Sequence, residues 1–152
     1  MQKEFDLLKK QAINIVWLKR DLRLQDHEPL FKAEKAGLPY VVIYLFEPSL
    51  IRTPDTSKRH LKFVYHSLLA MNEQLVPFRR KVEIFQAEAL DAFSYLEEKF
   101  QLHNLFSYCE TGTALSWKRD KQIASFCEQN KINWHESQRD GILRGIRNRN
   151  DW

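Results

Sequence analysis

The chain has 152 residues, of which 43% are hydrophobic and 29% charged, with a formal net charge of +4 at pH 7. This length and composition predict one soluble domain with a real core, and the interspersed acidic and basic residues do not mark a concentrated DNA-binding face. No apolar run reaches the roughly 18 residues of a membrane helix, and the charged first ten residues lack the apolar centre of a signal peptide, so we expect a cytoplasmic protein without a membrane partner.

Five short apolar runs predict β-strands, at residues 12–18, 40–46, 81–85, 104–109 and 131–135. Helical patterns separate them, at residues 27–36, 57–78, 87–100 and 114–130. The first helical pattern follows Asp26, which we expect to be its N-cap, and stops at Gly37. The second spaces its apolar residues at intervals of 3, 4, 3 and 4, on one helical face: Leu61, Val64, Leu68, Met71 and Leu75.

Strands that alternate with helices predict βαβ units and a parallel sheet. Because the strands are near-continuous apolar runs, both faces of that sheet should be covered by helices. The sequence therefore predicts a three-layer α/β/α domain over residues 12–136, after an extension at residues 1–11. Residues 137–152 are polar and aperiodic. We expect a solvated linker there, which leads to a second domain outside this chain. The linker contains four closely spaced arginines: Arg139, Arg144, Arg147 and Arg149.

Several common chemistries lack their motifs. None of the four glycines forms G-x-G-x-x-G after the first strand or belongs to a P-loop, which argues against a nicotinamide dehydrogenase or a P-loop NTPase. No G-x-S-x-G elbow and no histidine pair with metal-ligand spacing is present, so no catalytic or metal site is predicted. Cys109 and Cys127 fit no metal motif, and we expect two reduced, buried thiols.

Charged and aromatic residues follow three of the predicted strands. In an open α/β sheet, the carboxyl ends of parallel strands meet at one edge, where ligands bind. This polar and aromatic composition suits a flat, polar heterocycle. An alternative interpretation is a structural network, in which Asp21 pairs with an arginine and caps local backbone amides. The expected site residues are Arg20, Asp21, Leu22 and Arg23 after the first strand, Phe46 and Glu47 after the second, and Glu110 and Thr111 after the fourth.

Residues 13–27 contain an apolar strand followed by Lys19-Arg-Asp-Leu-Arg-Leu-Gln-Asp26. This stretch resembles the opening signature of the DNA photolyase/cryptochrome family. Weaker matches support it over nearly the whole chain from Ile13, at residues 42–48, 57–68, 110–120 and 140–152.

The resemblance implies a Rossmann-like, five-stranded parallel sheet of order 3-2-1-4-5. It also implies the amino-terminal domain of a two-domain protein, which holds a light-harvesting antenna chromophore in some members. The full-length parent would be a DNA photo-lyase, which uses blue light and FAD to repair pyrimidine dimers in damaged DNA, or a photoreceptor. FAD would belong to the carboxy-terminal helical domain, the partner of this one, and the fragment alone would not be catalytic.

Two positions carry over from the family to this chain. Glu110 matches an acid that contacts a folate antenna in some members, and Asp21 matches the turn near which deazaflavin or flavin antennas sit. This chain departs from the folate pattern, because Cys109 and Thr111-Gly112 replace the expected Asn and Glu. The chromophore type therefore stays open among folate, flavin, deazaflavin and lumazine. The alternative functions are a stand-alone nucleotide-binding α/β module and a structural docking domain with an empty cleft.

Overall fold

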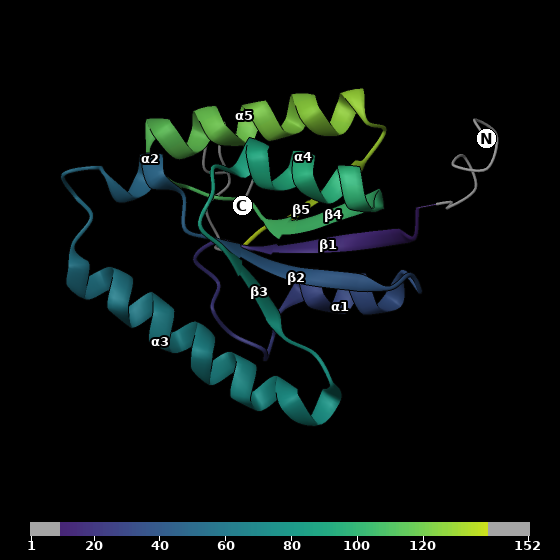
Figure 1. Cartoon of the computed structure of the whole chain (residues 1–152), viewed down its shortest axis with the longest axis horizontal. Helices are drawn as coiled ribbons and strands as arrows, with labels where there is room; N and C mark the ends of the chain where they lie inside the picture. Colours follow the sequence, from purple (N-terminus) through teal and green to yellow (C-terminus); the bar gives the residue numbers. More distant parts are fainter. Residues whose placement is uncertain (1–9, 140–152) are drawn as a thin grey trace, which may run out of the picture.

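A computed structural model of the chain describes residues 10–139 (Figure 1). Every predicted strand and helix is present. One short helix, α2, was not predicted, and the end of the third helix is a separate 3₁₀ turn, η2. In chain order the elements are β1 (Ala12–Leu18), α1 (Glu28–Lys35), β2 (Tyr40–Leu45), α2 (Pro48–Ile51), α3 (Lys58–Leu75), η2 (Val76–Phe78), β3 (Val82–Phe85), α4 (Ala89–Lys99), β4 (Gln101–Tyr108), α5 (Ala114–Gln129) and β5 (Asn133–Ser137).

The five strands form one parallel sheet in the order β3-β2-β1-β4-β5. Helices α1 and α3 cover one face of the sheet, and α4 and α5 cover the other (Figure 1). The predicted three-layer, Rossmann-like architecture and its strand order are therefore confirmed. Among the helices of the described part of the chain, none is both long and apolar enough to traverse a bilayer.

The central strand β1 shows why its sequence is apolar without alternation. Ile13, Ile15 and Trp17 pack toward α4 and α5, whereas Val16 and Leu18 pack toward α1 and α3. Side chains of a strand point to opposite faces in turn, so a strand covered on both faces is apolar at nearly every position. Asn14 is the exception: it is fully buried, and its Oδ1 accepts the backbone N–H and the Nδ2 of Asn104.

Two predicted local features differ in the structure. The N-cap of α1 is His27, whose side chain accepts the N–H of Leu30 at 3.2 Å, and not Asp26, which has a positive φ of 48°. Cys127 is buried as expected, but Cys109 is exposed because β4 ends one residue earlier. Neither cysteine forms a disulfide within residues 10–139.

The ends of β4 and β5 also differ from the prediction. β4 begins at Gln101, three residues before the predicted start, because the N–H of Gln101 donates to the carbonyl of Gln11 and extends the pairing with β1. β5 begins two residues late, after Lys131 turns the chain with a φ of 58°, and it runs to Ser137, one residue past the expected domain boundary. The expectations for residues 1–9 and 140–152 lie outside the described residues.

Helix α3 offers a test of how the layers are held together. Leu68 is fully buried in the core beneath α1 and α3, whereas its neighbour Leu69 is 38% exposed. We expect Leu68→Ala to lower the free energy of unfolding by about 2–5 kcal/mol, because it removes buried apolar surface and leaves a cavity. Leu69→Ala, the matched control, should cost much less. Urea denaturation of the two variants measures the difference, and equal losses would contradict the orientation of α3.

Candidate functional site

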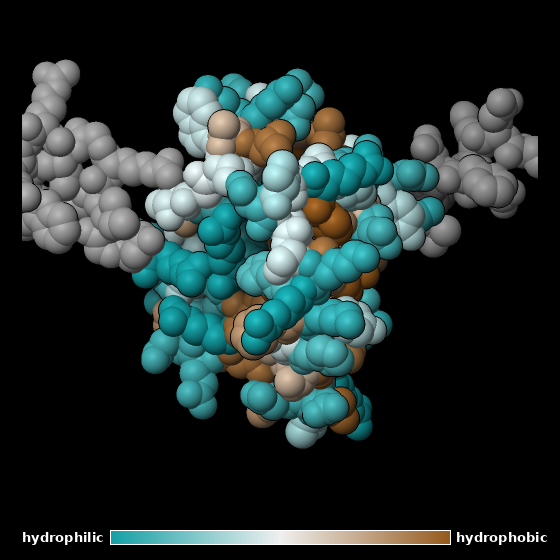
Figure 2. All heavy atoms as spheres, turned by 90° about the vertical axis from the view of Figure 1, so that its left-hand side faces the viewer, coloured by the Kyte–Doolittle hydropathy of each residue, from teal (hydrophilic) through white to brown (hydrophobic). Residues whose placement is uncertain are grey.

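The loops that follow β1, β2 and β4 meet at the carboxyl edge of the sheet, as the parallel topology requires. Figure 2 looks onto this side of the molecule, where hydrophilic side chains surround smaller apolar patches. The loops supply Arg20, Glu47 and Glu110, three of the residues that the sequence predicted for the site.

Arg119 of α5 holds these loops together. Its side chain is 10% exposed, and its Nη1 lies 2.7 Å from Glu47 Oε1. Its Nη2 donates to Glu110 Oε2 and lies 2.9 Å from Asp120 Oδ1. Glu110 also forms an ion pair with Arg20, with Nε and Oε1 3.2 Å apart. One guanidinium therefore links two strand-end loops to a helix.

Lys19 completes this group, with its Nζ 3.0 Å from Asp120 Oδ2. We call the six residues Lys19, Arg20, Glu47, Glu110, Arg119 and Asp120 the carboxyl-edge network. Its three cations and three carboxylates balance in formal charge. Because the charges balance, burying this network does not leave an uncompensated charge away from water. Its ion pairs also hold the hydrogen-bonding groups in fixed positions.

The floor of the carboxyl-edge network is aromatic. The indole of Trp17 is 1% exposed, with Lys19 Nζ 4.5 Å and Arg119 Cζ 4.8 Å from the ring centroid. Lys19 Nζ also lies 5.2 Å from the ring of Trp134. Cation–π contacts of this kind help to hold the two cationic groups against the buried ring.

Burial and neighbouring charges shift the pKa values of Arg119, Glu47 and the nearby Tyr44. Burial would lower the pKa of Arg119, but the carboxylates of Glu47, Asp120 and Glu110 outweigh it and raise that pKa. Burial raises the pKa of Glu47, although Arg119 opposes this. Burial, with Glu110 and Glu47 nearby, raises the pKa of Tyr44 to about 12. Arg119 thus stays charged, and its site suits polar recognition better than proton transfer.

Within residues 10–139 Asp21 pairs with no arginine, so that part of the alternative interpretation was wrong, whereas the expected capping of a local backbone amide is present. Its carboxylate is buried, accepts the N–H of Lys19 at 2.9 Å, and lies 2.5 Å from His27 Nε2. His27 Nδ1 accepts the N–H of Leu30, so Nε2 carries the proton and donates it to Asp21. The pair ties the loop after β1 to the start of α1. Both side chains are 1% exposed, so the pair is chiefly a structural contact.

The other expected site residues are spread over different surroundings. Leu22 and Phe46 are half-buried against the core beneath α1 and α3, where Phe46 contacts the ring of Tyr44. Arg23 is exposed and leans toward Tyr108, 6.0 Å from its ring centroid, away from the carboxyl-edge network. Thr111 is exposed beside Glu110. The structure therefore brings together Arg20, Glu47 and Glu110, with Thr111 at the rim. Asp21 lines the small cavity beside them, and Leu22, Arg23 and Phe46 lie elsewhere.

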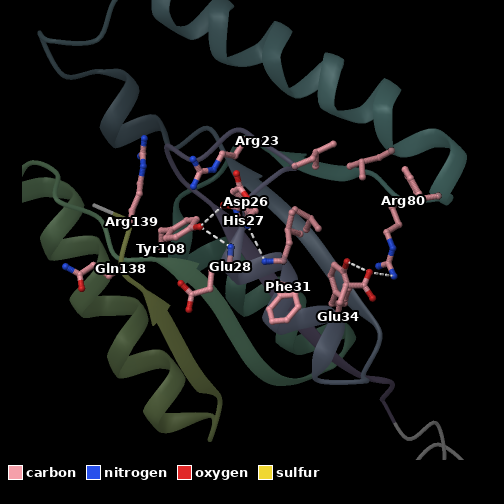
Figure 3. A pocket seen from close by; sticks show the side chains of 16 residues that line it. Arg23, Asp26, His27, Glu28, Phe31, Glu34, Arg80, Tyr108, Gln138 and Arg139 are labelled. Carbon is pink, nitrogen blue, oxygen red and sulfur yellow. Dashed lines mark hydrogen bonds and ion pairs between the residues drawn. The ribbon is translucent and has the colours of Figure 1, made fainter. Parts of the chain in front are cut away.

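Two cavities adjoin this edge. One has a volume of about 30 Å³, which is room for a water molecule, and Arg20, Glu110 and Thr111 are among its lining residues. The other has a volume of about 880 Å³ and lies beside α1 (Figure 3). Tyr108 and Arg139 line both cavities. Among residues 10–139, no group of three metal-binding side chains comes together.

Sequence reasoning missed Arg119 as a site residue. The signal available was a basic and an acidic residue, Arg119 and Asp120, in the early turns of a helix that follows a strand-end loop. The amino-terminal end of such a helix lies at the carboxyl edge of a parallel sheet.

Comparison with known proteins matches the family model described as DNA photolyase to residues 14–145. A cryptochrome DASH from Synechocystis is 50% identical over 34 residues, which are 22% of this chain and 7% of that protein. A deoxyribodipyrimidine photo-lyase from Buchnera aphidicola is 23% identical over 100 residues, 61% of this chain and 20% of that protein.

Solved structures show the same likeness. An archaeal photolyase from Sulfolobus tokodaii aligns with a TM-score of 0.74 and 27% identity, over 83% of this chain and 29% of that one. A Synechocystis cryptochrome aligns with a TM-score of 0.78 and 19% identity, over 85% of this chain and 28% of that one, which supports the fold alone. The chain thus spans less than a third of the length of each of these relatives.

Removing Arg119 tests its central place in the carboxyl-edge network. We expect Arg119→Ala to lower the free energy of unfolding by about 3–5 kcal/mol, because it leaves the buried carboxylate of Glu47 without its ion-pair partner and weakens the pairing of Glu110 and Asp120. Arg20→Ala, which removes a guanidinium that is 61% exposed, should cost less than about 1 kcal/mol. Urea denaturation of both variants measures the contrast, and similar losses would show that Arg119 is not the shared partner.

The Asp21–His27 pair predicts a dependence on pH. Burial alone would raise the pKa of Asp21, but hydrogen bonds from His27 and from the backbone N–H of Lys19 outweigh it and lower that pKa below 3.8. The contribution of the carboxylate to stability is therefore complete above pH 3.8, and it is lost as the pH falls through the folded-state pKa.

We expect Asp21→Asn to be less stable than the wild type by about 1–3 kcal/mol at neutral pH, since it removes a charged hydrogen-bond acceptor. The gap should narrow as the pH falls below 3.8. Thermal melts across this range provide the measurement, with the exposed residue Asp55 changed to Asn as the control. A gap that stays constant down to acid pH would rule out a lowered pKa.

Proposed function

The chain belongs to the DNA photolyase family, and on that basis we propose that it is the amino-terminal, light-harvesting domain of a photolyase or cryptochrome. Residues 12–136 form this domain in the proposal, and residues 137–152 lead toward a helical, FAD-binding domain. The full-length protein uses blue light to repair pyrimidine dimers in DNA or to signal. The named relatives, which include a photo-lyase and cryptochromes, support this proposal.

The observation that carries the proposal is the convergence of polar groups from three loops at the carboxyl edge. Arg20 offers an exposed guanidinium, and Glu110 offers a carboxylate that Arg119 holds in place. A donor and an acceptor fixed side by side suit the polar edge of a flat heterocycle. When bound, such a chromophore absorbs near-ultraviolet or blue light and passes the excitation energy on to FAD.

Space limits how the chromophore is held. The cavity beside Arg20 and Glu110 has only about 30 Å³, so the ring lies against the carboxyl edge and not within it. In this proposal the helical domain supplies the second wall. The archaeal photolyase with a TM-score of 0.74 has two FAD molecules, with the implication of a novel light-harvesting cofactor, which supports a flavin as one candidate class.

A second candidate function is a structural docking domain with no chromophore. Arg119, Glu47 and Glu110 fill the space between the strand ends with their own ion pairs, and this observation favours it. In that function the carboxyl edge only receives the helical domain.

Accessory absorbance separates the two functions. The full-length protein is purified gently and, if colourless apart from FAD, reconstituted with folate, flavin, deazaflavin and lumazine. We expect one of these to bind, and Arg20→Ala to weaken its binding about tenfold, since a hydrogen bond to a charged group is lost. FAD content should not change. Lys99→Ala, an exposed cation at the far end of α4, is the control.

Failure of all four chromophores to bind would reject the light-harvesting role and favour the docking domain.

The isolated 152-residue chain should leave pyrimidine dimers intact under blue light, because the proposal places FAD in the helical domain. Dimer cleavage by this chain alone would contradict that assignment.

A further inference from the structure

The cavity of about 880 Å³ lies between α1 and the α3–η2 segment (Figure 3), and we call it the α1–α3 cavity. Its volume is within the range of pockets that hold small-molecule ligands, roughly 300–1,000 Å³. Tyr40 and Val42 of β2 contribute to its lining, together with Phe31 from α1 and Phe78 from η2. It is separate from the carboxyl-edge network, none of whose members lines it.

The apolar walls expose two large aromatic rings. Phe31 is 65% exposed and Phe78 is 72% exposed, although both border the same hollow and come from different elements. Leu30 and Leu75 line the cavity beside them. Exposed aromatic side chains gathered around a cavity mark a binding surface, because a planar ligand would remove both rings from water.

The charged groups of the cavity divide between its two ends (Figure 3). At one end Arg80 forms an ion pair with Glu34, with Nη2 2.9 Å from Oε1, and its guanidinium lies 4.3 Å from the ring centroid of Tyr40. Elsewhere in the cavity Glu28 forms an ion pair with Lys32, with Oε1 2.7 Å from Nζ. These pairs leave no net charge at their positions.

At the other end lie Arg23 and Arg139, near Tyr108 (Figure 3). Neither arginine forms an ion pair with any residue of the described range 10–139. Asp26 and Glu28 are the carboxylates of the described residues that line this end, and because Glu28 is paired with Lys32 the local charge is net positive. The hydroxyl of Tyr108 accepts the N–H of Glu28 and donates to the carbonyl of Asp26, which fixes the ring in place.

We propose that the α1–α3 cavity binds a small planar aromatic anion of the nucleoside monophosphate class. The base lies between Phe31 and Phe78, and the phosphate lies at Arg23 and Arg139. A guanidinium matches the oxygens of a phosphate with paired donors. This site is independent of the chromophore proposed for the carboxyl edge, and the chain carries it whether or not that chromophore binds.

The test uses AMP as the probe, with adenosine and inorganic phosphate as its two halves, on the 152-residue chain. Isothermal titration calorimetry gives the affinity, and amide chemical shifts give the location. We expect AMP to bind more tightly than either half, with shifts at Phe31 and Tyr40. Phe31→Ala and Arg23→Gln, which change exposed side chains and should leave the fold intact, should each weaken binding about tenfold.

Two matched controls lie on the same side of the sheet but outside the cavity. Phe63→Ala changes a ring that is 68% exposed on α3, and Arg59→Gln changes an exposed cation near the start of that helix, and neither should alter AMP binding. Absence of binding at millimolar AMP would overturn the inference. So would AMP binding that Arg20→Ala weakens and Phe31→Ala does not, because the ligand would then lie at the carboxyl edge. Neither result bears on accessory absorbance.

Discussion

Placing the guanidinium of Arg119 inside a protein costs several kcal/mol unless carboxylates compensate it, and this requirement shapes the whole carboxyl edge. Glu47 and Glu110 come from loops 63 positions apart in the numbering, yet both must reach the same group. Each loop is thereby fixed to α5 as well as to its own strand. The polar surface at this edge is consequently rigid, and any ligand meets groups that are already in position.

A second anchor holds the opposite side of the same edge. The Asp21–His27 pair joins the end of β1 to the beginning of α1, and the ring of His27 packs edge-on against Tyr108, 5.1 Å between centroids. Tyr108 in turn borders both cavities. The Asp21–His27 pair therefore supports one side of the Tyr108 ring, which the hydrogen bonds of its hydroxyl to Glu28 and Asp26 hold at the other end.

The sequence predicted the layers well because they depend on local patterns. The mostly apolar run in β1 follows from burial of the strand on both faces. The spacing of Val64, Leu68 and Met71 follows from burial of one face of α3. Strand order was different: periodicity carries no information about it, and only the resemblance to a known family supplied it.

The site was predicted in part, for physical reasons. Glu47 and Glu110 could be expected because they directly follow strands. Arg119 could not, since it lies within a helix whose pattern does not distinguish a buried cation from a solvated one. Asp21 has arginines close by in the sequence, and this pattern favours an ion pair. The tight turn instead directs its carboxylate to His27 and to the N–H of Lys19.

The position of Trp17 has a consequence for photochemistry. Two permanent positive charges, on Lys19 and Arg119, lie within 5 Å of the centre of its indole. Removing an electron from this ring would create a third positive charge beside them, and the low dielectric of the interior strengthens that repulsion. The carboxylates paired with Lys19 and Arg119 act in the opposite direction, because they stabilise positive charge nearby. The ion pairs beside the ring therefore set how readily Trp17 gives up an electron.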